Sequence, residues 1–200
     1  FHPHVASTCD DGAFAEISRL CASPCVVAVG ETGLDYNRNF SSKSDQLRVF
    51  EQHLELASKV RKPMFLHQRE AHEDFHQLLS KYRDKLSGGV VHCFTDSEAA
   101  LKDYLALDMY IGITGWVCDE RRGLDLQRIV SLIPLNRLLI ETDAPYLLPR
   151  NLTSKPKNRR NEPKYLTSVV DKIADCYQLA SEEIAEATTN NARRLFNFVI

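Results

Sequence analysis

The sequence has no long apolar run, no CxxC pair and no glycine-rich phosphate loop. No apolar stretch approaches the roughly 20 residues that cross a bilayer, so we expect no membrane partner. Neither G-x-G-x-x-G nor a Walker A segment is present, so a nucleotide cofactor is not expected. Gly and Pro number only 8 each among 200 residues, which excludes low-complexity and collagen-like chains.

The net charge of the chain is also small. The formal charge is −2, which argues against a large non-specific surface for polyanions but leaves room for a local basic patch. The 6 cysteines form no tight cluster and are expected to be reduced thiols. This cysteine usage predicts a cytoplasmic or nuclear protein.

Short apolar runs alternate with amphipathic stretches along the chain. Such runs are typical of buried parallel strands. They lie at 26–30, 64–66, 89–91, 110–113 and 138–140. Helical periodicity follows each run; Ser44 is a candidate N-cap, and three further helical stretches close the chain at 166–176, 181–187 and 192–198, with Asn190 as a cap.

This alternation predicts a single α/β domain over residues 1–200 with a parallel sheet. Two architectures fit it: an open doubly wound sheet and a (β/α)8 barrel. Only about five strands are visible, against eight in a closed barrel. Either the sheet is open, or the front of a barrel lies outside this chain.

Polar side chains follow four of the five runs directly. They are Glu31, His67, His92, and the pair Glu141 and Asp143. In parallel α/β proteins the carboxyl ends of the strands share one edge, where functional sites are built. Each residue alone has an ordinary structural role in turns or hydrogen bonds. Their coincidence at four strand ends favours a site for a divalent metal, because titratable groups there are costly unless paired or metal-bound.

Other histidines have simpler interpretations. His2-Pro3-His4 is an H-x-H pair, but a proline interrupts it and no strand precedes it, so we expect a loop from which His2 reaches the site. His53, His72 and His76 are predicted to lie on solvated helix surfaces.

A basic segment follows the last predicted site strand. Residues 150–164 carry Arg150, Lys155, Lys157, Arg159, Arg160 and Lys164 against one acid, Glu162. This excess favours contacts to the phosphates of an anionic substrate over a merely solvated loop. Trp116 and Tyr146 follow two strand ends and could stack on a base or pack in the core; the sequence does not separate these roles.

Six segments together resemble the TatD family of metal-dependent deoxyribonucleases. They are GETGLDYNRNF (30–40), PMFLHQREAHEDF (63–75), VVHCFT (90–95), YIGITGWVCDERRGL (110–124), LLIETDAPYLLPR (138–150) and RRNEP (159–163). The resemblance spans nearly the whole chain in the right order. It implies a TIM-barrel-type metal-dependent hydrolase with magnesium-dependent 3′–5′ exonuclease activity on single-stranded DNA, and on RNA in some members.

The resemblance also implies roles for particular residues. Glu31 corresponds to a bridging metal carboxylate, and His67 and His92 to strand-end metal ligands. Asp143 corresponds to the ligand that orients or deprotonates the attacking water, so Asp143 and Glu31 are the catalytic candidates, with Glu141 supporting the ligands from behind. Substrate contact or loop support is implied for Arg69, Arg160 and Asn161, and His2 joins this substrate-binding set.

Two features depart from the family pattern. Family members begin with a strand that often carries an H-x-H metal pair, whereas His2-Pro3-His4 resembles their segment after the third strand. We therefore expect an incomplete barrel that lacks its first two to three strands. In addition, Gln68 follows His67, where relatives often have a small residue.

The predicted cofactor is one or two divalent ions. Carboxylates favour Mg²⁺ or Mn²⁺, and the imidazoles also accept Zn²⁺. Two alternatives stay open: a related amidohydrolase acting on a small amide, ester or lactone, and a non-catalytic truncated form.

Overall fold

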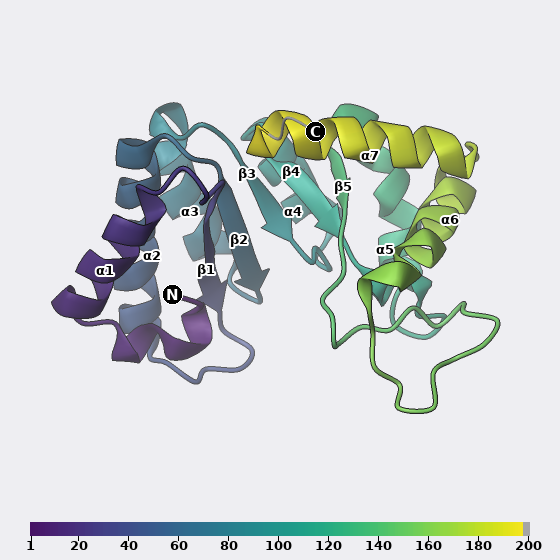
Figure 1. The fold of residues 1–200 in the computed structure, drawn as a ribbon, viewed down its shortest axis with the longest axis horizontal. Helices are drawn as coiled ribbons and strands as arrows, with labels where there is room; N and C mark the ends of the chain where they lie inside the picture. The colour runs from purple at the N-terminus through teal and green to yellow at the C-terminus, as the bar shows by residue number, and fades with distance from the viewer. Residues whose placement is uncertain (198–200) are drawn as a thin grey trace.

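The computed structural model describes residues 1–197, whose strands form one parallel sheet (Figure 1). The strands are β1 (Val29–Asp35), β2 (Met64–Arg69), β3 (Gly89–His92), β4 (Tyr110–Ile113) and β5 (Leu138–Ile140). Each strand pairs with the next in sequence, giving the order β1-β2-β3-β4-β5. A doubly wound sheet reverses its order at a switch point, so this unreversed order is that of a barrel wall. The predicted TIM-barrel-type fold is confirmed, and the doubly wound alternative is excluded.

Helices connect the strands and cover the sheet. They are α1 (Asp11–Cys21), α2 (Lys43–Val60), α3 (His72–Tyr82), α4 (Glu98–Ala106), α5 (Leu124–Ile129), α6 (Leu166–Tyr177) and α7 (Ser181–Phe196). The N-cap of α2 is Ser42 and not Ser44, because Ser42 is extended and its Oγ accepts from the Asp45 amide at 3.1 Å. No helix within residues 1–197 is both long and apolar enough to span a bilayer.

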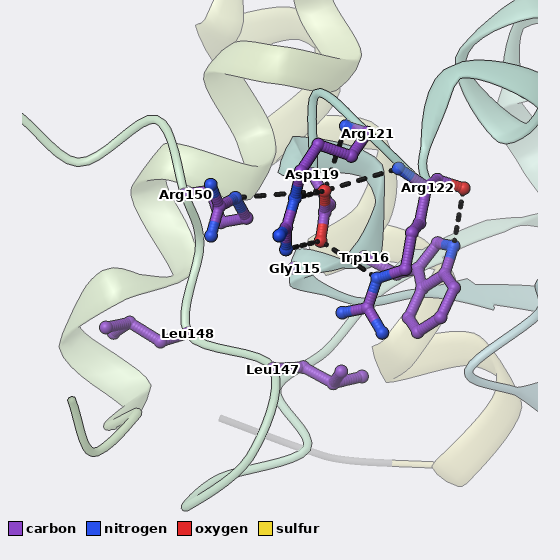
Figure 2. A pocket seen from close by; sticks show the side chains of 8 residues that line it. All are labelled: Gly115, Trp116, Asp119, Arg121, Arg122, Leu147, Leu148 and Arg150. Carbon is purple, nitrogen blue, oxygen red and sulfur yellow. Dashed lines mark hydrogen bonds and ion pairs between the residues drawn. The ribbon is translucent and has the colours of Figure 1, made fainter.

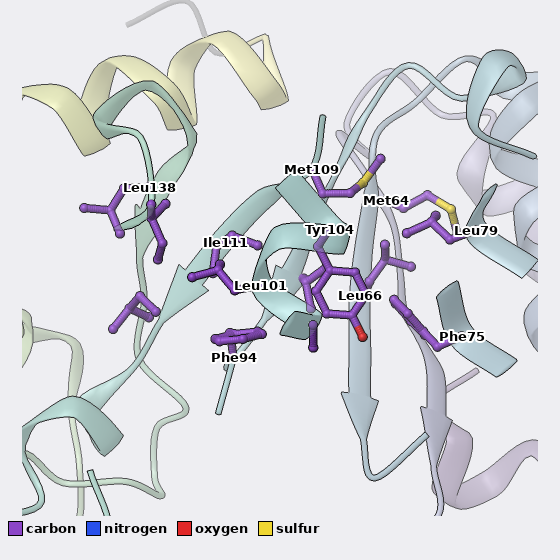
Figure 3. Packing of buried hydrophobic residues seen from close by; sticks show 14 of the residues in the cluster. Met64, Leu66, Phe75, Leu79, Phe94, Leu101, Tyr104, Met109, Ile111 and Leu138 are labelled. Carbon is purple, nitrogen blue, oxygen red and sulfur yellow. The ribbon is translucent and has the colours of Figure 1, made fainter. Parts of the chain in front are cut away.

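The largest part of the core lies between the sheet and helices α2 to α6. Alternate strand residues point to this face, and those from β2 to β5 include Met64, Leu66, Val91, Ile111 and Leu138. They pack against helix residues that include Phe75, Leu79 and Tyr104, all of them fully buried (Figure 3). The sheet is therefore anchored on one side by close-packed apolar side chains.

The opposite face of the sheet carries the other alternate residues. Near the strand starts, Val90, Tyr110 and Leu139 form a small apolar cluster with Leu195 of α7. In Figure 1, α7 crosses the end of the sheet where the strands begin. This face is thus apolar where α7 covers it, near the strand starts. At the carboxyl ends of the strands, the same face is free to carry polar residues.

Strand β1 runs further than the sequence predicts. The expected run ended at Gly30, but the strand extends from Val29 to Asp35, so Glu31 lies inside it. Gly30 and Gly33 have φ of +154° and +143°, and a Cβ there would stand 2.3 Å from the Phe65 carbonyl oxygen and 1.9 Å from that of His67. Only glycine permits this approach, so the two glycines let β1 lie close enough to pair with β2.

Helix α7 replaces two predicted helical stretches. The sequence suggested a break with Asn190 as a cap, but the helix is continuous from Ser181 to Phe196. The neighbouring Asn191 side chain donates to the carbonyls of Leu135 at 2.7 Å and Leu138 at 2.8 Å. These tertiary contacts of Asn191 outweigh the tendency of Asn190 to cap a helix. The predicted end of this stretch, Phe198, lies outside the described residues.

The prediction that His53 is a solvated surface residue is wrong. Its side chain is fully buried in α2, where Nδ1 donates to the Val49 carbonyl at 2.8 Å and the ring packs edge-on against Phe14. Burial lowers the pKa of His53 to about 4. Between about pH 4 and 6.5, the ring is therefore neutral in the folded protein but charged in the unfolded chain.

We predict that this histidine makes the protein less stable in acid. The folded pKa of His53 lies below the ordinary value of 6.5, so its contribution is complete above pH 6.5 and is lost as the pH falls towards 4. The loss should approach about 3 kcal/mol in the free energy of unfolding. Urea unfolding of wild type and His53→Gln across this range measures it. The two curves should converge at low pH, whereas His76→Gln should follow wild type; parallel curves for His53→Gln would contradict the prediction.

Candidate metal centre

Glu31 is the hub of a polar cluster on the open face of the sheet. Its Oε1 lies 2.9 Å from Nδ1 of His67 on β2, 3.3 Å from Nε2 of His2 and 3.9 Å from Nε2 of His92 at the end of β3. His67 and His92 are paired in register, which sets the two rings on the same face of neighbouring strands. One carboxylate thus contacts three imidazoles from three segments of the chain.

Asp35 forms a second contact point at the end of β1. Its side chain is 2% exposed, and Oδ2 lies 2.7 Å from Nε2 of His4 and 3.3 Å from Nε2 of His67. Oδ1 accepts the backbone amides of Asn37 and Arg38. His67 is therefore held between two carboxylates, Glu31 and Asp35.

His92 is held from behind by Glu141, which follows β5. Oε2 of Glu141 lies 2.9 Å from Nδ1 of His92, at an ion-pair distance but without a well-aligned hydrogen bond, and Oε1 accepts the Cys93 amide at 2.6 Å. A Cβ at Gly112 on β4 would stand 2.4 Å from Oε1 of Glu141. The glycine therefore leaves the space that this carboxylate occupies.

Asp143 is the most open acidic residue of the cluster. Its side chain is 42% exposed, and Oδ1 lies 3.8 Å from Nε2 of His92. With these distances, the four residues expected at strand ends, Glu31, His67, His92 and Asp143, lie in one continuous cluster.

Charges in the cluster offset one another. Burial opposes ionisation of Glu31, but hydrogen bonds from His2 and His67 lower its pKa well below the usual range. Burial would lower the pKa of His67, but hydrogen bonds to Asp35 and Glu31 raise it to about 9. Burial also works against a charge on His92, yet Glu141 raises the pKa of His92 overall. The protonated His67 ring therefore supplies positive charge beside the two carboxylates that contact it.

The donor set fits a divalent cation. Two groups of three side chains have ligand atoms within 4.8 Å of one another: His2, His4 and His67 in one, and His92, Cys93 and Asp143 in the other. Glu31 lies between them. Burial raises the pKa of the Cys93 thiol to about 12, so at neutral pH this side chain is a neutral thiol and the strong donors are oxygens and nitrogens.

His4 and Asp35 are site residues that sequence reasoning missed. The prediction ended the first run at Gly30 and so considered only Glu31 there, and it assigned His4 to a loop. A strand prolonged to Asp35 would have shown the signal, because residues 31, 33 and 35 share one face under a period of two.

The remaining candidate residues lie in different places. Arg69 at the end of β2 and Arg160 are exposed. Asn161 is 2% exposed, and its Nδ2 donates to the carbonyls of Tyr146 at 2.7 Å and Leu147 at 3.3 Å. The Asn161 side chain thus supports the loop that follows Asp143.

Gln68, which departs from the family pattern, links β2 to α4. Its Nε2 donates to Asp96 at 2.8 Å and to the hydroxyl of Tyr104 at 2.7 Å. The same hydroxyl lies 2.8 Å from Nδ1 of His72, whose Nε2 contacts Asp103 at 2.9 Å. His72 therefore belongs to a half-buried network and is not a solvated residue as predicted. The network fixes the end of β2 directly beside His67.

A barrel-type sheet that gathers histidines and carboxylates at its carboxyl edge defines the class of metal-dependent hydrolases. Comparison with known proteins agrees. The TatD related DNase family matches residues 1–197. The chain belongs to this family.

Relatives and solved structures extend this finding. The 3′-5′ ssDNA/RNA exonuclease TatD of Cronobacter turicensis is 51% identical over 195 residues, which cover 98% of this chain and 74% of the relative. The structure of YjjV, a TatD homologue from Escherichia coli, has a TM-score of 0.89 at 27% identity and covers 100% of this chain and 75% of that chain. A TatD family hydrolase from Entamoeba histolytica has a TM-score of 0.85 at 29% identity, covering 98% of this chain and 72% of that chain.

We predict that metal binding releases protons. His67, with a pKa of about 9, is protonated near neutral pH. A cation can bind its ring nitrogen only by displacing that proton. Near pH 7.5, Mn²⁺ binding should release about one proton per ion bound next to His67. The affinity should rise with pH up to about 9 for the same reason. Calorimetry in buffers of different ionisation enthalpy measures the release.

A matched pair of histidine variants sharpens this test. His67→Asn should remove the proton release and weaken binding. His76→Asn, on α3 and outside the cluster, should retain both properties. A binding heat that is independent of the buffer for wild type would contradict the prediction.

Proposed function

We propose that this protein is a metal-dependent 3′–5′ exonuclease acting on single-stranded DNA, and on RNA. The observation that carries the proposal is the open position of Asp143 beside His92, in a cluster that His92 shares with Glu31 and His67, in a chain that belongs to the TatD related DNase family. The curated relatives at about half identity are named as exonucleases for single-stranded DNA and RNA, which supports the substrate class.

In this proposal Glu31, His67, His92 and Asp143 hold the cation, with Glu31 between two ligand groups. His2 and His4 add imidazole donors on the His67 side, so the donor set offers room for one or two ions. Mg²⁺ suits the carboxylates, and Mn²⁺ or Zn²⁺ suit the mixed set with imidazoles. When bound, the cation would supply positive charge that neutralises the phosphodiester and acidifies a water molecule.

Residues of the chain accept the proton of the attacking water and orient the histidine rings. Asp143 is exposed enough to meet solvent and substrate, and its carboxylate accepts the proton of the attacking water. Glu141 fixes the His92 ring through Nδ1, leaving Nε2 towards the cluster. Asp35 contacts His67 through Nε2, and Nδ1 of that ring is turned towards Glu31. Ligands held from behind by carboxylates bind metals more tightly, since their orientation is set in advance.

Substrate contacts are assigned to polar residues around the cluster. Arg69 and Arg160 are exposed cations that can meet phosphates, and His2 lies 3.3 Å from Glu31 at the edge of the centre. Asn161 contributes by holding the loop after Asp143. A reducing compartment, cytoplasmic in this proposal, is consistent with 6 cysteines that are all free.

Loss of the proton acceptor is expected to abolish nuclease activity while the fold survives. Asp143→Asn should lower kcat on a single-stranded oligonucleotide by at least about 100-fold, because general base catalysis typically contributes that much. His92→Ala should do the same by weakening metal binding. Product analysis on labelled oligonucleotides measures the rate, and circular dichroism checks folding.

The matched control is Asp125→Asn, since Asp125 on α5 has a side chain 91% exposed. This variant should retain wild-type activity. Full activity in both Asp143→Asn and His92→Ala would exclude these residues from the reaction. A parallel panel of amides, esters and lactones tests the amidohydrolase alternative, and activity there but not on oligonucleotides would overturn the proposal.

A further inference from the structure

A cavity lies beside the metal centre, at the carboxyl ends of β4 and β5. It has a volume of about 210 Å³ and opens between the short helix η3 (Gly115–Cys118), the turn that follows it, and the segment after Asp143 (Figure 2). The two segments touch closely, since a Cβ at Gly115 would stand 2.2 Å from the Leu147 carbonyl oxygen. Leu147 is four residues from Asp143, so at most about 14 Å of chain separates them.

Three arginines surround one buried carboxylate in this cavity. Asp119 has a side chain only 4% exposed, and it contacts Arg122 at 3.1 Å, Arg121 at 3.3 Å and Arg150 at 3.7 Å. Burial opposes the charge on Asp119, but hydrogen bonds from the backbone and guanidinium of Arg121 and from Arg122 hold its pKa well below the usual range. Figure 2 shows the three guanidiniums converging on this carboxylate.

The arginines keep unused donors that face solvent. Their side chains are 61%, 56% and 37% exposed for Arg121, Arg122 and Arg150. Asp119 accepts the backbone amide of Arg122 and, from its guanidinium, only Nε, so within the described part of the chain both terminal nitrogens of that guanidinium are without a hydrogen bond. Arg150 also binds Glu120. Three guanidiniums against two carboxylates leave a net positive charge, in a chain whose formal charge is −2.

An aromatic and an aliphatic side chain complete the cavity. The guanidinium of Arg122 stacks on the Trp116 ring at 4.4 Å, and the indole nitrogen donates to the Arg122 carbonyl at 3.2 Å. Leu147 extends towards the Trp116 side of the cavity, whereas Leu148 points the other way (Figure 2). Leu147 has a φ of +53°, rare for a residue with a branched side chain, and the buried Asn161 amide binds its carbonyl. A strained residue held in this way indicates a local geometry kept for function.

We propose that this cavity binds one nucleotide of the single-stranded substrate, with its phosphate on Arg121 and Arg122 and its base against the Arg122–Trp116 stack and Leu147. The inference rests on the proposed nuclease function and adds the place where the strand is held next to the cleaved bond. Arginine recognises phosphate through paired N–H donors, and stacking on an aromatic or guanidinium plane accepts any base. The buried Asp119 holds the guanidiniums in place, so little side-chain entropy is lost on binding.

Trp116 is the only tryptophan of the chain, so its fluorescence reports directly on the cavity. Addition of a single-stranded oligonucleotide should change this emission in the slow variant Asp143→Asn, with Mn²⁺ present. An abasic strand of equal charge should bind more weakly; equal affinity would overturn the assignment of a base to Trp116 and Leu147.

Two variants test the cavity by turnover. Arg121→Gln/Arg122→Gln removes the phosphate donors, and Leu147→Trp fills the space while leaving the arginines and Asp119 intact. Both should raise KM for single-stranded DNA by about 10-fold, with kcat little changed. The salt dependence of log KM should become shallower by about 0.7 for each phosphate that the double arginine variant no longer neutralises.

A small chromogenic phosphodiester that reaches only the metal centre serves as the control substrate. Its hydrolysis should be unchanged in both variants, which separates the cavity from the catalytic machinery and from misfolding. DNA hydrolysis with an unchanged KM in both variants and no fluorescence response would overturn the proposal and leave the nuclease function standing. A fluorescence response without DNA hydrolysis would support the cavity and remove the nuclease function.

Discussion

The contact between Glu31 and the imidazoles of neighbouring strands is the constraint on which the centre depends. Glu31 reaches His67 only because β1 lies close against β2, and this approach requires the bare backbones of Gly30 and Gly33. Burying carboxylates beside one another is costly unless positive charge accompanies them. The proton on His67 provides such charge, and the neighbouring carboxylates also raise the pKa of His92. Strand pairing, local glycine geometry and charge balance are therefore parts of one arrangement.

Much of the fold follows from the sequence because buried parallel strands are short apolar runs. Strands β4 and β5 match the predicted runs, and β2 and β3 begin where expected. The predicted run ended at Gly30 because Gly-Glu-Thr-Gly has a low strand propensity. The segment is nevertheless a strand because its glycines allow a close approach to β2 that a Cβ would block. The continuity of α7 and the burial of His53 depend on contacts distant in sequence, which periodicity does not encode.

The candidate centre was predicted in part for a geometric reason. Parallel strands bring their carboxyl ends to one edge, so polar residues directly after apolar runs converge there, as Glu31, His67, His92 and Asp143 do. Asp35 and His4 were missed because Asp35 lies in the unexpected part of β1 and His4 lies in a 3₁₀ helix. The sequence suggested phosphate contacts for Arg150 and base stacking for Trp116, but it could not predict the partnership of Asp119 with Arg150, which joins two loops that only the folded sheet brings together.

The unreversed strand order has a consequence for how the chain acquires its chemistry during synthesis. Strands that pair in the sheet are also synthesised one after the other, so the proposed cation ligands leave the ribosome strand by strand. A nascent chain that ends after β4 already contains Glu31, His67 and His92, yet it lacks Asp143 and the carboxylate behind His92. Such an intermediate could capture a metal ion before it could cleave anything. Hydrolytic competence would arrive only when β5 has brought Asp143 to the cluster.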